Sequence, residues 1–372
     1  MAKQKVVKTT DFYSLGKIKE CDAQWNLIYG MRSNGKSYAV KEEILKNFIA
    51  TGNKFIYLRR YNTEVKPSMV KGYFRDMCVQ NKFKKVPLRE IFGEEAVTIG
   101  TYTSEIQVYW RDKDVPPTTI GYIADLSTQA HQCGQSYPDV DNVIFEEFIA
   151  RDEGLTPYLP NEPTKLMDFL STVGRDRDLK VWLLGNTISR FCPYFSEWEL
   201  TGTQKQKAGE IQVYHINTGR SDGEGKPIYT TLACEHTEVM QTTNKMQFGK
   251  SSSMITEGGW QADIKPHLDG RLEDYSIIHT MVVEVMKYKF LCRYLYDQST
   301  QNCFWYVERK TTPTMTGTRY ICDTYQNNPL WTKNLKALTP NEDIAFRDLK
   351  NGKVVYCDNL TGTEFCSAIK ML

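Results

Sequence analysis

The chain has 372 residues, enough for two domains with buried cores, and its 41% hydrophobic and 25% charged residues are typical of a globular protein, which excludes wholesale disorder. The ten cysteines form no C-x-x-C pair and the five histidines do not join them at zinc-ligand spacing, so we expect reduced thiols and no zinc site. No stretch approaches the roughly 20 apolar residues of a membrane-spanning helix, and we expect a soluble, intracellular protein with no membrane partner.

The first motif along the chain is a complete G-x-x-x-x-G-K-S phosphate-binding loop, formed by Gly30, Met31, Arg32, Ser33, Asn34, Gly35, Lys36 and Ser37. An apolar stretch over 25–29 precedes it and apolar residues at helical spacing follow over 37–49, so strand, loop and helix come in the required order. In such loops backbone N–H groups surround the phosphates, the lysine reaches the terminal phosphates and the serine binds Mg²⁺. The motif predicts a nucleoside triphosphate site.

A strand predicted over 54–58 opens a basic stretch. Residues 53–90 contain ten Lys and Arg residues and three acids, a local excess of +7. Clustered cations suit contact with the phosphate backbone of a nucleic acid, and the candidate DNA contacts here are Lys82, Lys84 and Lys85. A solvated basic face is the alternative, because charge runs are commonly that. Beyond this stretch the pattern predicts a hairpin over 97–110 and a strand over 119–124.

The second chemical landmark is the stretch 141–148, a short apolar run that ends in Glu146 and Glu147. Such a run suits a buried parallel strand that delivers both carboxylates at its C-terminal edge, where ligands bind in open α/β sheets. We predict that Glu146 holds Mg²⁺, directly or through water, and that Glu147 orients and activates the attacking water. A strand ending in surface acids is the alternative, which the upstream phosphate-binding loop disfavours.

Two arginines and an asparagine extend the candidate site. A predicted helix over 164–173 is followed by Arg175 and Arg177, and a predicted strand over 179–184 is followed by Asn186. Each arginine is a candidate finger that neutralises transition-state charge at a neighbouring subunit's site; a surface Arg/Asp pair is the alternative. Asn186 is a candidate γ-phosphate sensor, with ordinary turn chemistry as its alternative.

The composition and the hydrophobic pattern of the sequence change after about residue 201. Residues 216–228 and 249–270 are rich in Gly, Ser, Thr and Asp and are predicted as connectors, with a short helix over 235–248 between them. Strands of a separate α+β domain are predicted over 277–285, 290–296, 304–307 and 320–325.

We therefore expect a phosphate-loop domain over 1–225, a linker over 226–273 and a C-terminal domain over 274–372. Basic and aromatic residues interleave in the C-terminal domain, as in proteins that contact nucleic acid through phosphates and stacking. Lys287 and Lys289 are its candidate DNA contacts, although half-buried strands show the same mixture.

Three further details are specific in combination: Arg59-Arg60-Tyr61 at the end of the second strand, Tyr137-Pro138 before the acidic strand, and Arg175-Asp176-Arg177. Together with the phosphate-binding loop and the acidic strand, they closely resemble the DNA-packaging ATPase of phi29-like tailed bacteriophages. The resemblance is strong over residues 25–195 and faint around 247–250.

This resemblance implies an α/β fold of the RecA-like, additional-strand catalytic-glutamate class of P-loop NTPases, with a mostly parallel sheet and flanking helices. It implies a smaller α+β C-terminal domain with a degenerate RNase H-like nuclease fold that grips DNA without cutting it. ATP and Mg²⁺ would occupy the site, and the catalytic residues would be Lys36, Glu147 and Arg175, the last acting in trans.

At the level of assembly, the resemblance implies a homopentameric ring at the portal of a viral prohead that drives double-stranded DNA inward. A structural packaging RNA is a further partner in this family. Such a motor would work in the host cytoplasm, join the prohead portal transiently and be absent from the mature virion.

Two positions depart from the family pattern. The family has aspartate where this chain has Glu146, so the choice of base between Glu146 and Glu147 stays open. Cys133 stands where the family has a lysine shortly before the Tyr-Pro pair, so no role for a cation carries over to that position.

Two other functions stay open at the level of sequence. A terminase-type motor with an active nuclease needs a carboxylate cluster that holds two metal ions, and scattered acids that could supply one are Glu284, Asp297, Glu308 and Asp323. A non-motor P-loop kinase would be indifferent to DNA.

Overall fold

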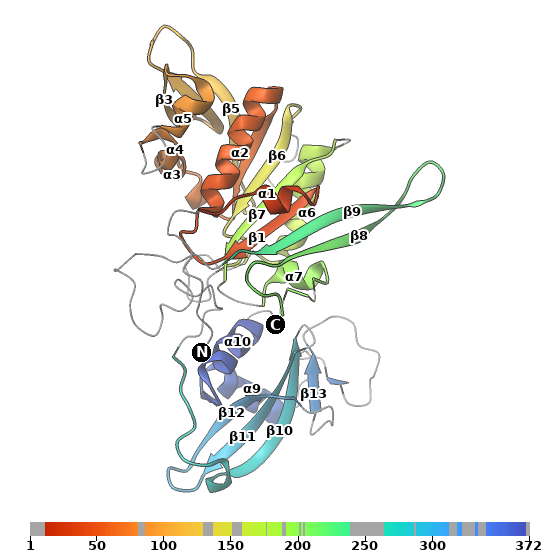
Figure 1. The fold of residues 1–372 in the computed structure, drawn as a ribbon. Coiled ribbons are helices and arrows are strands. Elements are labelled where there is room, and N and C mark those ends of the chain that lie inside the picture. The colour runs from red at the N-terminus through yellow and green to blue at the C-terminus, as the bar shows by residue number, and fades with distance from the viewer. Residues whose placement is uncertain are drawn as a thin grey trace, which may run out of the picture. The chain divides into compact units, whose positions relative to one another are not determined.

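The computed structural model describes residues 12–80, 86–128, 137–150, 158–175, 177–187, 191–200, 202–203, 205–238, 264–285, 288–311, 318–321, 332–333 and 340–369. The chain divides into two compact units (Figure 1). The first comprises residues 1–188 and 192–259, and the second comprises residues 189–191 and 260–372.

The first unit is built on a nine-stranded sheet with the order β3-β4-β5-β2-β6-β7-β1-β9-β8. Its six central strands are parallel: β5 (Thr118–Asp125), β2 (Lys54–Arg59), β6 (Val140–Glu146), β7 (Lys180–Asn186), β1 (Trp25–Gly30) and β9 (Pro227–His236). Antiparallel strands extend the two edges: β3 (Ala96–Tyr102) and β4 (Glu105–Trp110) at one, and β8 (Ile211–Ser221) at the other. The predicted α/β fold with a mostly parallel sheet is confirmed.

One strand separates the phosphate-loop strand from the acidic strand. Leu183 of β7 pairs with Leu27 of β1 on one side and with Phe145 of β6 on the other. This inserted strand is the feature that defines the additional-strand class. All three of these residues are buried, as expected for parallel strands covered on both faces.

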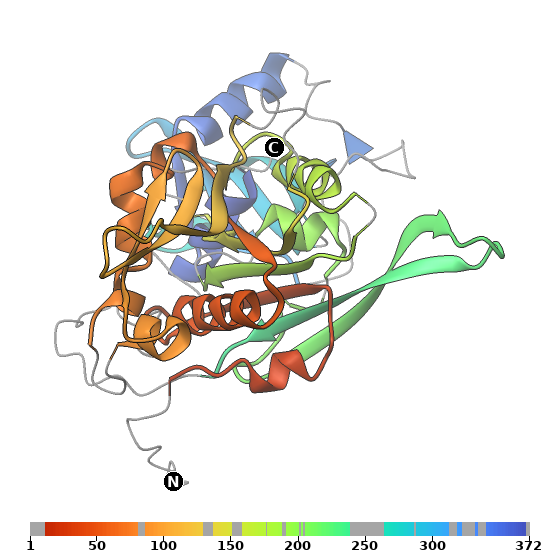
Figure 2. The ribbon, with the colours of Figure 1, turned by 90° about the horizontal axis from the view of Figure 1, so that it is seen from above.

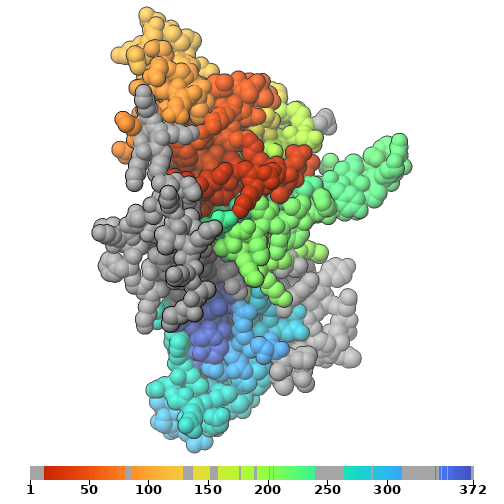
Figure 3. Space-filling model, in the orientation of Figure 1, coloured from red at the N-terminus to blue at the C-terminus, as the bar shows by residue number. Residues whose placement is uncertain are grey.

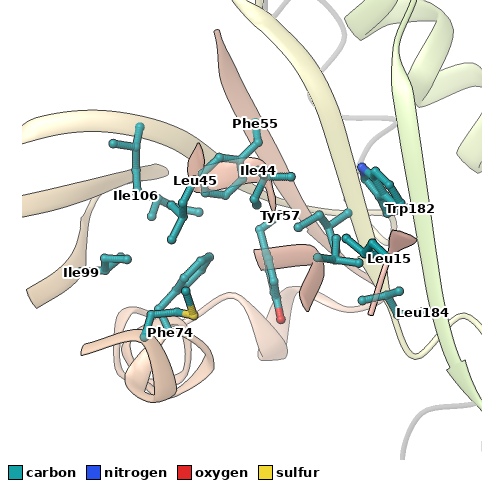
Figure 4. Close-up of a cluster of buried hydrophobic side chains, with 14 of the residues drawn as sticks. Leu15, Ile44, Leu45, Phe55, Tyr57, Phe74, Ile99, Ile106, Trp182 and Leu184 are labelled. Carbon is teal, nitrogen blue, oxygen red and sulfur yellow. The ribbon is translucent and has the colours of Figure 1, made fainter. Parts of the chain in front are cut away.

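Helices cover both faces of this sheet. One face carries α2 (Lys36–Thr51), α3 (Pro67–Tyr73), α4 (Arg75–Cys78) and α5 (Pro87–Phe92), and the other carries α6 (Glu162–Gly174) and α7 (Pro193–Glu197) (Figure 2). Alternation along β6 shows this: Ile144 packs in the cluster that contains Ile44 of α2, whereas the ring of Phe145 meets that of Tyr194 in α7 at 6.1 Å. Figure 4 shows Ile44 among the rings of that cluster, which include Phe55 and Phe74. The described part of this unit also contains two short elements: α1 (Gly16–Lys19) and the 3₁₀ turn Asn62–Glu64.

β8 and β9 form a long hairpin that projects from the first unit (Figures 1 and 3). The prediction of a connector over 216–228 is therefore wrong, because these residues form the outer part of the hairpin. Its residues are exposed on both faces of a two-stranded ribbon, apart from half-buried Ile216, so they show no apolar alternation and resemble a loop in sequence.

The linker predicted over 226–273 also begins too early. β9 is hydrogen-bonded in parallel to β1, with Trp25 opposite Leu232, so it belongs to the first sheet. Glu235 and His236 end this strand instead of starting the helix predicted over 235–248, of which residues 239–248 lie outside the described part.

The second unit contains a six-stranded sheet with the order β14-β13-β10-β11-β12-β15. Its strands are β10 (Ser276–Val285), β11 (Tyr288–Asp297), β12 (Asn302–Arg309), β13 (Thr318–Ile321), β14 (Thr332–Lys333) and β15 (Val354–Tyr356). Three antiparallel strands, β10 to β12, are followed by β13, which adds in parallel beside β10, and by β14, which adds in parallel beside β13. These five strands have the order of RNase H-like domains, and β15 adds beside β12. The α+β prediction is confirmed.

Among the described residues of this unit, two helices accompany the sheet: α9 (Pro340–Lys350) and α10 (Asn359–Ile369). A 3₁₀ turn, Leu272–Asp274, precedes β10. The core includes Phe290, Trp305 and Phe365, and also Phe191 from the 189–191 segment. Across the described ranges of both units, no helix is long and apolar enough to cross a membrane.

Candidate active site

The phosphate-binding loop joins β1 to α2, and its two glycines have different tasks. Gly35 has a φ of 96° directly before the first residue of α2, a conformation that side chains rarely adopt. A Cβ atom on Gly30 would lie 2.0 Å from Thr237 Oγ1, so the loop can approach the end of β9 this closely only with glycine. The loop ends at the N-terminus of a 16-residue helix, whose free N–H groups favour phosphate.

Lys36 is buried in this loop, with 6% of its surface exposed. Its Nζ donates to the carbonyl of Met31 at 2.6 Å and to Asn34 Oδ1 at 3.1 Å. Burial lowers the pKa of Lys36 to about 7; the negative charge of Glu146 opposes this effect and the positive charge of Arg32 adds to it. A polyphosphate beside Nζ would stabilise the charged lysine, so the loop fits a nucleoside triphosphate.

Glu146 is the last residue of β6 and is held in place by two partners. Tyr57 Oη donates to its Oε2 at 2.5 Å, and Arg59 Nη1 lies 3.5 Å from the same oxygen. Its side chain is 13% exposed, and Oε1 is buried without a hydrogen-bond partner among the described residues. A fixed carboxylate with an unused oxygen suits a Mg²⁺ ligand, and Ser37, half-buried in the first turn of α2, is the predicted second ligand.

Glu147 differs from its neighbour in conformation and exposure. It follows β6 with a φ of 60°, and its side chain is 50% exposed. Arg59 Nη2 approaches Glu147 Oε2 at 3.3 Å and also donates to Glu64 Oε1 at 2.5 Å. The buried, fixed Glu146 therefore suits the metal role, and the exposed Glu147 suits contact with a reacting water.

A second arginine fixes the backbone at this strand end. Arg60 Nη2 donates to the carbonyls of Glu147 at 3.0 Å and Phe148 at 3.1 Å. The same guanidinium forms a buried, two-point ion pair with Glu162, whose Oε1 also accepts from Tyr194 Oη. The unusual backbone of Glu147 is thus tied to the first turn of α6.

The end of β7 lies directly beside the phosphate-binding loop. Asn186 pairs with Gly30 across the sheet, and the N–H of Thr187 donates to the carbonyl of Gly30 at 3.1 Å. Thr187 is fully buried, and its Oγ1 has no hydrogen-bond partner within the described parts of the chain. The predicted sensor and the predicted phosphate loop therefore meet.

Arg175 lies at the other edge of the sheet from these groups. It follows α6, whose 13 residues span about 20 Å and run back from the Glu147 edge toward the start of β6. Arg175 is exposed and has a φ of 48° and a ψ of −103°, a sparsely populated backbone conformation. The structure does not bring Arg175 together with the phosphate loop of its own chain.

The interpretation of Arg177 as a finger is wrong. Its guanidinium donates four hydrogen bonds of 2.6 to 2.7 Å to backbone carbonyls, which use both terminal nitrogens. A guanidinium held in this way cannot extend to a neighbouring site.

The predicted DNA contacts are only partly described. Lys82, Lys84, Lys85 and Lys287 lie outside the described residues. Lys289 is half-buried on β11, directly opposite Glu284 of β10, so a neighbouring acid offsets its charge.

The acids proposed for a nuclease centre do not converge. Glu308 pairs with Arg293 at 2.8 Å, Asp297 is at the end of β11, and Asp323 lies outside the described residues. Within the described ranges, no three His, Cys, Asp or Glu side chains come together as a metal site.

Sequence reasoning missed the residues that hold the carboxylates. Tyr57 and Glu162 were visible only as strand and helix residues, and Arg59 and Arg60 only as part of the motif that carries the family resemblance. One signal was available: two adjacent arginines at the carboxyl end of a parallel strand lie at the ligand-binding edge of the sheet.

Residues 7–214 match the family model of the Podovirus DNA encapsidation protein (Gp16). The chain belongs to this family. It is 31% identical over 185 residues to the DNA packaging protein of Bacillus phage phi29, a match that covers 50% of this chain and 49% of the relative. It is 32% identical over 171 residues to that of Bacillus phage B103, covering 46% of each. The chain thus spans about half the length of the curated relatives it matches.

The encapsidation fold extends over both units. A solved structure of the bacteriophage phi29 viral genome packaging motor assembly aligns with 97% of this chain and 99% of its own, with a TM-score of 0.52 and 20% identity. The predicted resemblance is confirmed, and the shared fold includes the RNase H-like region, where the sequence resemblance had faded.

Proposed function

We propose that this protein is an ATP-driven translocase that packages double-stranded viral DNA into a preformed prohead. The observation that supports it most is the convergence of Lys36, Glu146 and Glu147 at one sheet edge in a member of the DNA encapsidation family. The family model matches residues 7–214, a range that includes all three of these residues.

The chemistry follows from the placement of each group. Loop N–H groups and Lys36 would bind the β- and γ-phosphates of ATP. Ser37 and Glu146 would hold a Mg²⁺ ion, which would supply positive charge to offset that of the phosphates. Glu147 accepts a proton from the attacking water, and Asn186 together with the Thr187 hydroxyl recognises the γ-phosphate.

The distant position of Arg175 supports an assembly in which neighbouring copies complete one another's sites. The arginine lies about 20 Å from the acidic edge of its own sheet, so it serves hydrolysis only at another subunit. We propose a homopentameric ring at the prohead portal, formed in the host cytoplasm, absent from the mature virion and able to dock on a packaging RNA.

The second unit would grip DNA without cutting it. Two observations disfavour the alternatives. The described acids of the RNase H-like sheet form no metal cluster, which disfavours an active nuclease. The match to a DNA encapsidation family disfavours a kinase that is indifferent to DNA. Lys289 and the lysines at 82, 84, 85 and 287 stay candidate phosphate contacts.

The test is steady-state ATP hydrolysis with and without double-stranded DNA, for the wild type, Glu147→Gln and Glu146→Gln. We expect DNA to stimulate turnover and Glu147→Gln to lower kcat by about 10²- to 10⁴-fold with ATP binding retained, as for loss of a general base. Glu146→Gln should instead raise the Mg²⁺ concentration needed for half-maximal rate. A rate of ATP hydrolysis that is the same with and without DNA, and that is unchanged in Glu147→Gln, would refute the proposal of a DNA-translocating motor.

A further inference from the structure

One side chain fastens the turn after α6 to the start of the acidic strand. The guanidinium of Arg177 donates through Nη1 and Nη2 to four backbone carbonyls, those of Pro138 (2.7 Å), Val140 (2.7 Å), Tyr137 (2.6 Å) and Val173 (2.7 Å). Tyr137 and Pro138 lead into β6, Val140 is its first residue, and Val173 belongs to the last turn of α6. Arg177 thus joins two segments that are distant in sequence.

Arg175 lies inside the loop that this clamp closes. Its N–H donates to the carbonyl of Ser171 at 3.0 Å, and the N–H of Arg177 donates to that of Gly174 at 2.8 Å. Between these two bonds, Arg175 takes its disfavoured backbone conformation, with a φ of 48°. A residue persists in such a region only where the surrounding contacts fix it on both sides.

The helix between the two ends of the site is anchored at its start as well. Glu162, the first residue of α6, is 1% exposed and pairs with Arg60, which also binds the carbonyl of Glu147. α6 spans about 20 Å and β6 about 23 Å, so helix and strand are matched in length and tied at both ends. The finger side chain is therefore placed by reference to the acidic strand of its own subunit.

We propose that Arg177 is a positioning residue that holds Arg175 in the orientation needed at the neighbouring subunit's site. This inference rests on the proposed function of Arg175 as a finger. The planar guanidinium presents donors in a fixed fork that satisfies four carbonyls at once, whereas a lysine ammonium keeps the charge and has three donors on one nitrogen. Lysine at position 177 could not donate to all four carbonyls, so the turn would be held by fewer hydrogen bonds and the side chain of Arg175 would shift.

The first experiment compares DNA-stimulated ATP hydrolysis by full-length assemblies of the wild type, Arg177→Lys and Asp178→Asn. Asp178 is an exposed neighbour in the same turn and serves as the matched control. We expect Arg177→Lys to lower kcat about 10- to 100-fold with unchanged KM, because misplacement of a group by about 1 Å has that effect. Asp178→Asn should hydrolyse ATP at the wild-type rate, and all three should bind ATP equally.

A double-mutant cycle separates positioning from general damage. If Arg177 acts only through Arg175, the ring that carries both Arg175→Ala and Arg177→Lys should be as slow as the ring with Arg175→Ala alone. A further loss in the double variant would overturn the proposal, because Arg177 would then act on something other than the finger.

Mixed rings test the direction of the effect. Arg177→Lys subunits mixed with Glu147→Gln subunits should regain activity, because an intact site then meets an intact finger at hybrid interfaces. Suppose that Arg175→Ala subunits mixed with Glu147→Gln subunits regain activity but Arg177→Lys subunits in the same mixture do not. This result would overturn the positioning role of Arg177 and leave the finger role of Arg175 intact. An Arg175→Ala ring that works at the wild-type rate would remove the finger itself, and with it the proposed function on which this inference depends.

Discussion

At the scale of single residues, three of the residues predicted for the site or adjacent to them have unusual backbone conformations. Ser33 of the phosphate loop, Glu147 and Arg175 are non-glycine residues with φ values of 59°, 60° and 48°. Each such conformation costs about 1–3 kcal/mol and needs support from its surroundings. Arg60 donates to the carbonyl of Glu147 itself, and Arg177 donates to the carbonyl of Val173, two residues before Arg175. These two arginines are therefore the contacts that support the unusual backbone of Glu147 and Arg175.

Tyr57 offers a direct test of how Glu146 is held. Burial raises the pKa of the Tyr57 phenol well above its usual range, and the charge of Glu146 adds to this, so the hydroxyl stays a donor to the carboxylate at any working pH. Tyr57→Phe should lower the free energy of unfolding by about 1.5–3 kcal/mol, the value of a hydrogen bond to a charged group. It should also raise the Mg²⁺ concentration needed for hydrolysis.

Tyr73→Phe is the matched control for this variant. Its ring stacks on Tyr57 at 5.4 Å, and its hydroxyl donates to the carbonyl of Glu64, away from Glu146. Urea unfolding and Mg²⁺ titrations of ATP turnover would compare the two variants. Equal Mg²⁺ dependence in both would mean that Tyr57 does not orient the metal-binding carboxylate.

At the scale of elements, the outer half of the β8–β9 hairpin is separable from the fold that carries it. Asn217 pairs with Tyr229, and the residues beyond this pair are exposed on both faces of the ribbon. Replacing residues 218–228 by Asn-Gly, a two-residue turn that suits a hairpin, should leave the melting temperature and ATP binding unchanged. Thermal melting checks this, with Leu232→Ala as a contrast.

Leu232→Ala is a useful contrast because Leu232 is buried, whereas residues 218–228 are exposed. Leu232 is 1% exposed where β9 pairs with β1, so Leu232→Ala should destabilise the protein by about 2–5 kcal/mol. A large loss of stability in the shortened hairpin would show instead that its outer half contributes to the folded core.

The same hairpin shows where sequence reasoning stops. Strands and helices of the α/β core were predictable because buried parallel strands are continuous apolar runs, as in 54–58 and 141–148. A ribbon exposed on both faces carries no such pattern, and Thr218, Gly219 and Ser221 resemble a connector. The phosphate loop and acidic pair were equally visible, since their spacing is local. The groups that hold these acids lie elsewhere in the chain: Tyr57 of β2 donates to Glu146, and Glu162 of α6 acts through Arg60. Neither role could be predicted without the fold.

At the scale of the whole molecule, the chain crosses between the two units more than once. Residues 1–188 belong to the first unit, 189–191 to the second, 192–259 again to the first, and 260–372 to the second. Phe191 packs in the core of the second unit beside Phe290, with ring centroids 6.0 Å apart. The first crossing follows Thr187 by only a few residues, so the end of β7 beside the phosphate-binding loop is close in sequence to Phe191 of the second unit's core.

This organisation predicts which fragments fold. A fragment ending at residue 225 lacks β9 and exposes the edge of β1, whose Tyr29 carbonyl accepts from Thr237, so it should neither fold nor bind ATP. A fragment of residues 1–238 with Phe191→Ser keeps every strand of the first sheet and removes a ring that belongs to the other core. Circular dichroism and titration with a fluorescent ATP analogue distinguish the two fragments. Equal ATP binding by both would mean that β9 is dispensable, and that the phosphate loop is held by β7 alone.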